Sequence, residues 1–251
     1  MFANGRHSVL TSSLKFQMNC HDCSLSRLCL PGCLQNNEVD QLENIIKRNH
    51  PLHKGEHLFR AGEPMQQVYA LRSGALKTYL LDPDGNEQIT GFTLPGELVG
   101  LDAFGNSSFP SYAVALETSL VCTIPLADLE ELAGHIPSLR KQLLVTLSRE
   151  LQEEQQHYSH NRESAERRLA VFLLNLSLRY SRRSLSATSF ILSMSRGEIG
   201  NYLGLTTETV SRLFSRFRRQ GLLEIKGREL RLMHPTALNQ LGRIEVRQLA
   251  V

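Results

Sequence analysis

The sequence lacks features that would place it in several common protein classes. It has no run of about 18 apolar residues, so we expect no membrane-spanning helix and no membrane partner. Its first residues lack the apolar core of a signal peptide, and we therefore expect a cytoplasmic protein. No Ser/His/Asp order, phosphate loop or carboxylate cluster is present, and the nine histidines are scattered, so the sequence does not indicate an enzyme.

The net charge of +3 is unevenly distributed. Residues 1–159 carry a net charge of −6, whereas residues 160–251 carry +9. A basic C-terminal third is typical of nucleic-acid binding. A solvated basic face without a partner would have the same composition, so charge alone leaves both interpretations open.

The hydrophobic pattern changes several times along the chain. A short helix is expected over residues 37–48. From about residue 50 to residue 126, short apolar runs alternate with Gly and Pro turns, which predicts a small antiparallel roll or barrel. Pro137 opens a helix of roughly 20–24 residues. We expect four parts: a Cys-rich segment at 1–34, a β-roll domain at 35–135, a dimerisation helix at 136–160 and a DNA-binding domain at 161–251.

The long helix lies at the junction of two oppositely charged parts. This position favours a connector that also forms a parallel dimer seam, although a helix buried in its own domain is the alternative. Glu150 falls on or beside the apolar face. The like charges of two chains would repel each other there, so we expect the dimer to be only marginally stable. The residues expected in the seam of the homodimer are Leu143, Leu147, Leu151, Glu154 and Tyr158.

Residues 195–219 predict a helix-turn-helix. Ser195 and Glu198 have the spacing of a capping box, and Gly204 suits the turn. Thr206 or Thr207 caps the second helix. The polar–apolar pattern of residues 222–233 then predicts a β-hairpin, which would be the wing of a winged helix-turn-helix.

The second helix separates into an apolar face and a polar face at about 100° per residue. On the polar face, Arg212 can donate two hydrogen bonds to guanine, Glu208 can accept from cytosine, and Ser211 can contact a base edge. An αα-hairpin with a solvated basic face is the alternative. Further DNA contacts, to phosphates or at the start of the helix, are expected from Thr206, Thr207, Arg216, Arg218, Arg219, Lys226 and Arg228.

Four of the five cysteines lie between residues 20 and 33. In a cytoplasmic chain this crowding favours metal or redox chemistry over disulfides. Thiolates suit an iron–sulfur cluster, zinc or Cu(I). One Cys-x2-Cys pair with a distant Cys122 favours a cluster over the paired knuckles of a zinc site. Cys33 is a fifth thiol that competes as the fourth ligand, and Cys122 as a plain buried strand residue is a further alternative.

The roll, the long helix and the winged helix-turn-helix together resemble the cyclic-AMP-receptor-protein (CRP) superfamily, over nearly the whole chain. Residues 198–217 resemble its DNA-binding signature. The Cys-x2-Cys-x5-Cys pattern at residues 20–29, the remote Cys122 and residues 87–103 resemble the fumarate-and-nitrate-reduction (FNR) regulators. The implied fold is α+β, with a cyclic-nucleotide-binding-like β-roll.

This resemblance implies an oxygen-responsive transcription regulator. An iron–sulfur [4Fe-4S] cluster would hold an active dimer without oxygen, and oxygen would degrade the cluster and leave inactive monomers. The implied ligands are Cys20, Cys23, Cys29 and Cys122. The alternative is a regulator of the same fold without a cluster, which would carry structural zinc or sense another signal.

The resemblance also implies the partners. The pattern of Glu208, Ser211 and Arg212 matches the family's reading residues, which implies double-stranded DNA with a TTGAT-N4-ATCAA-like palindrome. The acidic hairpin at residues 82–87 would contact RNA polymerase. Residues 96–101 look like a phosphate-binding cassette, but residues 104–112 lack the Arg or Lys that would pair with a cyclic phosphate, so we expect no cyclic nucleotide.

Overall fold

A computed structural model describes residues 19–48, 50–160 and 163–242. The first 18 residues of the expected Cys-rich segment and residues 243–251 of the expected DNA-binding domain lie outside this description. No helix within the described ranges is long and apolar enough to cross a membrane.

Eight short strands form the β-roll. They are β1 (Lys47–Arg48), β2 (His57–Phe59), β3 (Gln67–Ser73), β4 (Leu76–Leu81), β5 (Glu87–Thr93), β6 (Leu98–Val99), β7 (Tyr112–Ala115) and β8 (Leu120–Pro125). They make two antiparallel sheets with the orders β1-β8-β3-β6 and β2-β7-β4-β5. Phe59, Leu71 and Leu76 belong to the roll's buried core, so the roll predicted from the sequence is confirmed.

A glycine is required where β3 turns into β4. Gly74 has a φ of 88°, in the left-handed region that side chains disfavour. A Cβ at this position would also lie 2.2 Å from Oγ of Ser119. The turn that joins the two sheets therefore depends on the absence of a side chain.

Short helices accompany the strands of the roll. They are η1 (Leu30–Cys33), α1 (Asn36–Ile45), η2 (Leu101–Ala103) and α2 (Leu126–His135). The sequence predicts a single helix over residues 37–48, and this end point is wrong. Lys47 and Arg48 instead pair with Thr123 and Cys122 of β8, because tertiary strand pairing outweighs the weak local helix preference.

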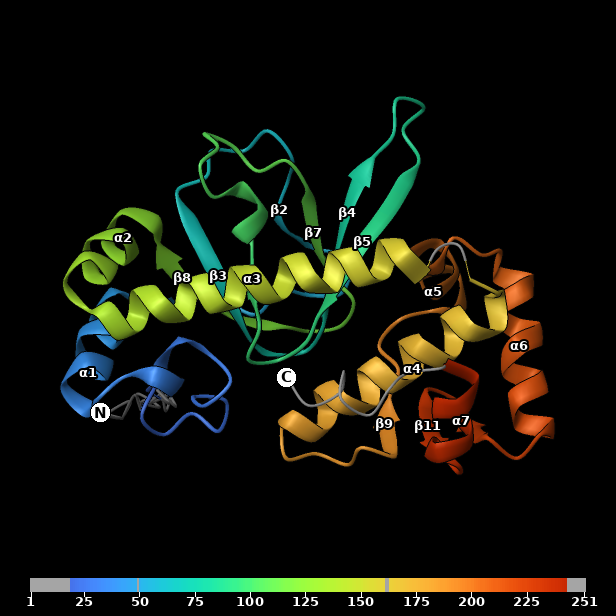
Figure 1. Cartoon of the computed structure of the whole chain (residues 1–251). Coiled ribbons are helices and arrows are strands. Elements are labelled where there is room, and N and C mark those ends of the chain that lie inside the picture. Colours follow the sequence, from blue (N-terminus) through green and yellow to red (C-terminus); the bar gives the residue numbers. More distant parts are fainter. Residues whose placement is uncertain (1–18, 49, 161–162, 243–251) are drawn as a thin grey trace, which may run out of the picture.

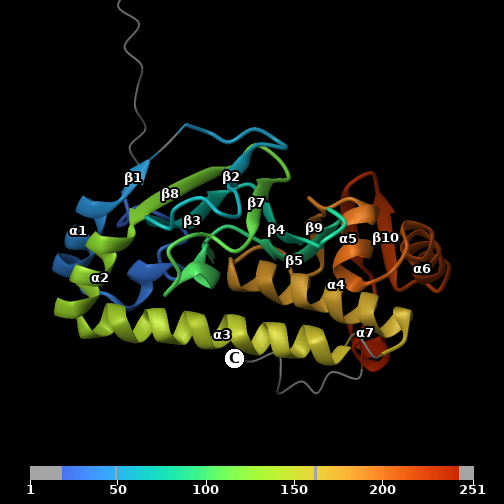
Figure 2. The ribbon, with the colours of Figure 1, turned by 90° about the horizontal axis from the view of Figure 1, so that it is seen from above.

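The long helix α3 (Pro137–His160) has 24 residues, as the sequence predicts. It runs along one side of the molecule, from the end that holds α1 and α2 towards the C-terminal helices (Figure 1). Seen from above, α3 lies beside the roll, and α4 (Ala165–Arg182) runs back beside it (Figure 2).

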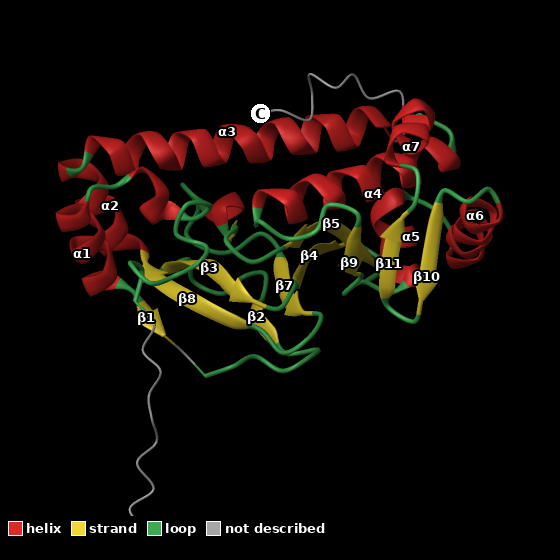
Figure 3. Ribbon diagram, turned by 90° about the horizontal axis from the view of Figure 1, so that it is seen from below, coloured by secondary structure: helices red, strands yellow, loops and turns green. Residues whose placement is uncertain are grey.

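The C-terminal part is a winged helix-turn-helix. After α4 come β9 (Ser189–Ile191), α5 (Arg196–Leu203), α6 (Thr207–Arg219), β10 (Leu223–Lys226), β11 (Glu229–Leu232) and α7 (Pro235–Gly242). The strands form a sheet with the order β10-β11-β9 (Figure 3). The α+β class and the winged helix-turn-helix are confirmed, whereas α7 is not predicted from the sequence.

Candidate functional site

The helix-turn-helix is built by the caps that the sequence predicts. Oγ of Ser195 accepts from the amide of Glu198 at 3.2 Å, and the Glu198 carboxylate accepts from the amide of Ser195 at 2.8 Å. Gly204 ends α5 in the left-handed region, and Thr206 is the residue that caps α6. Sequence reasoning did not identify Gly200, where a Cβ would lie 2.6 Å from the backbone oxygen of Leu205; glycine allows α5 and α6 to approach there.

Helix α6 has one buried face and one exposed face. Its buried residues are Val210, Leu213, Phe214 and Phe217. The outer residues Glu208, Ser211, Arg212, Ser215, Arg216, Arg218 and Arg219 are all exposed. Helix α6 lies at the end of the molecule opposite α1 and the cysteine segment (Figure 1). The described helix can therefore present acceptors, hydroxyls and guanidinium groups to a DNA groove.

The basic residues expected to contact DNA have different surroundings. Nη2 of Arg212 donates to Oγ1 of Thr209 at 3.3 Å, within the exposed face of α6. Arg216 forms an ion pair with Glu166 of α4 at 3.3 Å. Arg228, at the wing, forms an ion pair with Glu117 of the roll at 2.8 Å. A DNA phosphate at the wing would therefore compete with a carboxylate of the protein's own roll.

Four of the five cysteines line one cavity. Cys20, Cys23 and Cys29 come from the N-terminal segment and Cys122 comes from β8. The amide of Cys20 donates to Oε2 of Glu43 in α1 at 2.9 Å, which holds the start of the segment. The cavity is otherwise mostly apolar, and its walls include Leu25, Leu30, Leu42, Ile46, Leu71 and Ile124.

Cys33 does not line this cavity. It is exposed at the end of η1, and its Sγ lies 3.4 Å from the backbone oxygen of Leu30 and 3.5 Å from that of Ser138 in α3. The structure therefore groups Cys122, and not Cys33, with the three cysteines of the segment.

The cavity disfavours negative charge on the sulfur atoms of Cys20, Cys29 and Cys122. Burial raises the pKa of the Cys20 and Cys122 thiols and raises that of Cys29 to about 12. Neighbouring cysteines raise these pKa values further, whereas Arg48 and Arg72 oppose the rise at Cys122. Thiolates in this cavity would need a positively charged group to balance them. A bound metal supplies such a charge, and its binding is coupled to release of the thiol protons.

In the part of the chain that the structure describes, the walls of the cavity carry four thiols and no histidine or carboxylate, a donor set that suits a [4Fe-4S] cluster or a zinc ion. Within the described ranges, no three His, Cys, Asp or Glu side chains converge closely enough to hold one metal ion. Four sulfurs around one tetrahedral zinc, each at about 2.3 Å, would lie within about 4 Å of each other. In a [4Fe-4S] cluster each thiolate binds a different iron, so the sulfurs lie farther apart. The four cysteines on the walls of this cavity could supply one thiolate to each iron.

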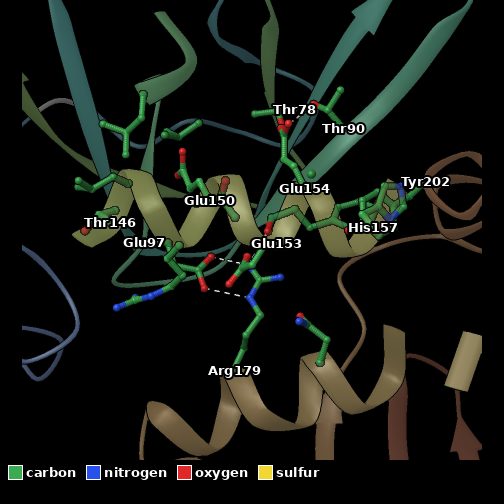
Figure 4. A pocket seen from close by; sticks show the side chains of 18 of the residues that line it. Thr78, Thr90, Glu97, Thr146, Glu150, Glu153, Glu154, His157, Arg179 and Tyr202 are labelled. Atoms are coloured by element: carbon green, nitrogen blue, oxygen red, sulfur yellow. Dashed lines mark hydrogen bonds and ion pairs between the residues drawn. The ribbon is translucent and has the colours of Figure 1, made fainter. Parts of the chain in front are cut away.

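A larger cleft of about 470 Å³ lies between the roll, α3 and α4. Glu97, from the segment that resembles a phosphate-binding cassette, points into it (Figure 4). Its carboxylate is bound by Arg179 of α4 and by Arg183, which follows directly after α4. We expect from the sequence that no cyclic nucleotide binds here, and this stays a prediction. In the structure, the glutamate of the cassette is bound by two arginines of the protein itself.

The residues expected in the dimer seam lie on different sides of α3. Leu143 and Leu147 are partly buried against the core of the roll. Leu151 is 60% exposed, and Leu144, seven residues before it on the same helix, is 62% exposed. Glu154 is exposed and extends towards Thr78 of the roll (Figure 4), and the side chain of Tyr158 lies outside the described part. The seam itself stays a prediction.

Glu150 faces a group of carboxylates inside the cleft. Its pKa is raised to about 8 by burial and by the charges of Asp102, Glu153, Glu97 and Glu154. The folded state therefore favours the protonated form. As pH rises from about 4.5 to about 8, ionisation of Glu150 reduces the stability of the fold.

Glu150→Gln should remove this pH-dependent cost. We expect the free energy of unfolding at pH 8 to rise by about 1–2 kcal/mol, and the gain to vanish near pH 4. Urea unfolding at several pH values measures it, with Glu131→Gln on the exposed surface of α2 as the control. Equal gains at pH 4 and pH 8 would contradict the assignment.

Comparison with known proteins identifies two domains. A cyclic nucleotide-binding domain model matches residues 49–135, and a Crp-like helix-turn-helix domain model matches residues 167–241. The fumarate and nitrate reduction regulatory proteins of Escherichia coli K12 and Shigella dysenteriae are each 48% identical to this chain over 226 residues. In both cases the match covers 90% of each chain.

Solved structures show the same architecture. The structure of FixK2 from Bradyrhizobium japonicum is 33% identical and superposes with a TM-score of 0.72, covering 80% of this chain and 100% of that one. A CooA mutant from Carboxydothermus hydrogenoformans, 18% identical, has a TM-score of 0.64 and covers 79% of this chain and 88% of its own. The second likeness shows the fold alone.

Proposed function

The chain belongs to the CRP/FNR family of DNA-binding transcription regulators, among the relatives of the fumarate and nitrate reduction regulatory proteins, and on that premise we propose that it regulates transcription in response to oxygen. It is a regulator and not an enzyme. The observation that carries the proposal is the cavity that brings Cys122 of the roll together with the three cysteines of the N-terminal segment.

In this proposal, Cys20, Cys23, Cys29 and Cys122 hold a [4Fe-4S] cluster. When bound, the cluster supplies the irons that balance four thiolate charges and the site at which oxygen reacts. The protein positions the four sulfurs and surrounds them with apolar side chains, which limits the access of water. Glu43 anchors the first cysteine through its amide.

The cysteine segment also braces the start of α3. Helix η1 packs against α3, and Sγ of Cys33 lies 3.5 Å from the backbone oxygen of Ser138. Oγ of Ser138 donates to Oε2 of Glu38 in α1 at 3.3 Å. Loss of the cluster would release Cys122 from the segment, weaken this bracing and so disturb a seam formed by α3.

The exposed leucines of α3 favour dimer formation through this helix. Leu151→Ala should raise the dissociation constant of the anaerobic dimer by at least about tenfold, because each protomer loses apolar burial at the seam. Sedimentation equilibrium measures this. Leu185→Ala, which removes an equally exposed leucine (57%) near β9, should leave the dimer unchanged. Equal effects of the two variants would mean that α3 is not the seam.

Two recognition helices of such a dimer would read a palindrome. We assign base contacts to Glu208, Ser211 and Arg212, and a TTGAT-N4-ATCAA-like operator follows from the family pattern. Phosphate contacts from Arg216, Arg219, Lys226 and Arg228, together with Thr206 and Thr207 at the start of α6, would fix the register.

The hairpin between β4 and β5 is proposed as the contact with RNA polymerase. Its turn is ordered, because Oδ1 of Asp82 accepts from the amides of Asp84 at 2.9 Å and Asn86 at 2.8 Å. Leu80 and Leu81 beside it are exposed hydrophobic residues. A rigid acidic turn with exposed leucines suits a protein partner.

Operator binding before and after exposure to air tests the proposed function. Protein loaded with iron and sulfide without oxygen should bind the palindrome, and the same sample should lose binding as the cluster degrades. Binding that is unchanged by air and by removal of iron would overturn oxygen regulation and leave a regulator of the same fold with another signal.

A further inference from the structure

Glu97 joins the roll to the DNA-binding domain. Its carboxylate accepts hydrogen bonds from Nε of Arg179 at 2.9 Å and from Nη2 of Arg183 at 2.6 Å. Nη2 of Arg179 also forms an ion pair with the same carboxylate (Figure 4). Both arginines also reach the backbone of the roll, since Arg179 donates to the oxygen of Phe92 and Arg183 to that of Pro95. Arg179 of α4 and Arg183, which follows directly after α4, are therefore held by one short segment of the roll.

The charge on Glu97 depends on these arginines. Burial opposes its ionisation, but the positive charges of Arg179 and Arg183 outweigh burial and hold the pKa of Glu97 at about 2. The amide of Leu94 donates a further hydrogen bond to the carboxylate at 2.8 Å. Charge-assisted hydrogen bonds of this kind are stronger than neutral ones, and loss of one partner leaves the other charges poorly compensated.

The other side of this turn touches the cysteine segment. Gly96 has a φ of 91°, and a Cβ there would lie 3.1 Å from Cβ of Leu28 and 3.7 Å from Cβ of Leu25. The amide of Gly96 donates to the oxygen of Leu71 in β3 at 2.7 Å, and the amide of Leu71 donates to the oxygen of Glu97 at 2.9 Å. Gly96, Leu25 and Leu71 also line the cysteine cavity.

We infer that the turn at residues 95–97 is a second link between the cysteine segment and the DNA-binding domain, separate from α3. On this account Glu97 is a positioning residue that fixes α4, and with it α6, against the roll. A shift of Leu28 moves the turn and so changes how firmly Glu97 holds Arg179 and Arg183. The inference rests on the proposed function only in treating the cysteine segment as the sensor.

One backbone amide reports on this docking. The amide of Ile89 in β5 donates to Oδ1 of Asn201 in α5 at 2.7 Å, and Nδ2 of Asn201 donates to the oxygen of Glu87 at 2.7 Å. These bonds exist only while the DNA-binding domain lies against the roll. Exchange of the Ile89 amide with solvent deuterium therefore measures undocking, whereas amides between β3 and β8 measure opening of the roll itself.

The first test is Glu97→Gln in the full chain, exposed to air and free of cluster. Glutamine keeps the size and the acceptor for Leu94 but loses the charge. We expect exchange at Ile89 to rise by about tenfold or more, with β3–β8 amides unchanged. Glu63→Gln is the matched control, because Glu63 pairs with Arg60 within the roll. Unchanged exchange at Ile89, or an equal rise at the β3–β8 amides, would overturn the positioning role.

The second test addresses the link to the cysteine segment. Leu28→Ala keeps Cβ but removes Cδ1 of Leu28, which would lie 3.6 Å from a Cβ at Gly96, and so weakens the packing against the turn. Leu34→Ala removes the same atoms from another partly buried leucine of that part of the chain. Exchange at Ile89, scaled to the β3–β8 amides, should rise in Leu28→Ala and not in Leu34→Ala. Equal behaviour of the two variants would contradict the link. Because neither test uses cluster or DNA, failure of the proposed function would not change these outcomes.

Discussion

Cys122→Ala is expected to abolish cluster assembly, whereas Cys33→Ala should leave it intact. Cys122 lies on the wall of the cavity that Cys20, Cys23 and Cys29 share, and the exposed Cys33 is directed towards the backbone of α3. With three thiolates, one iron of a cubane would lack its protein ligand. Iron content and visible absorbance after anaerobic reconstitution should fall to background in the first variant only.

The two variants also separate ligation from folding. Removing a half-buried sulfur from β8 should cost about 1 kcal/mol of stability, which is small beside the loss of a ligand. Circular dichroism of both variants in air should therefore match the wild type. Loss of the cluster in Cys33→Ala, with normal assembly in Cys122→Ala, would make the site local to the N-terminal segment.

Arg212→Ala should weaken binding to the palindrome and relax its base preference. Loss of a bidentate contact to guanine costs about 1–3 kcal/mol per half-site, which is about fivefold to 150-fold in affinity for each. Arg212 is exposed on the outer face of α6, in the N-terminal half of the helix, which is the half expected to read bases. Competition binding with operators altered at single positions measures both affinity and preference.

Arg219→Ala is the comparison for that experiment. Arg219 is exposed at the C-terminal end of α6, where we expect it to contact phosphate. Its loss should weaken binding to all sequences alike. It should also reduce the slope of log affinity against log salt concentration by about one for each half-site. If Arg212→Ala behaves in the same uniform way, the wrong face of α6 has been assigned to the bases.

The local features of the fold could be predicted from the sequence. Ser195, Glu198 and Gly204 define the ends of α5 by short-range hydrogen bonds and backbone geometry, and these depend on neighbouring residues alone. The apolar spacing in α6 likewise specifies its buried face, because helical periodicity is a local property. The grouping of Cys122 with the N-terminal cysteines was proposed from resemblance, and the structure places these four residues on one cavity.

Other contacts between distant residues could not be predicted, because no local pattern specifies them. Lys47 and Arg48 follow a helical pattern but join β8, because the partner strand lies about 75 residues later in the chain. Leu143 and Leu147 have the spacing of a seam yet pack partly on the roll, while Leu144 is exposed. The bonds between Glu97 and Arg179 join residues 82 positions apart, and no sequence periodicity connects them.

The central claim is that a cluster held by four cysteines controls the dimer. The most direct measurement is sedimentation velocity of cluster-loaded protein, with visible absorbance recorded across the same boundary, first without oxygen and then after air. We predict that the visible absorbance sediments with the dimer, and that air bleaches it and converts the protein to monomer in step. Colourless anaerobic protein that is already dimeric, or bleaching that leaves the dimer intact, would contradict the account.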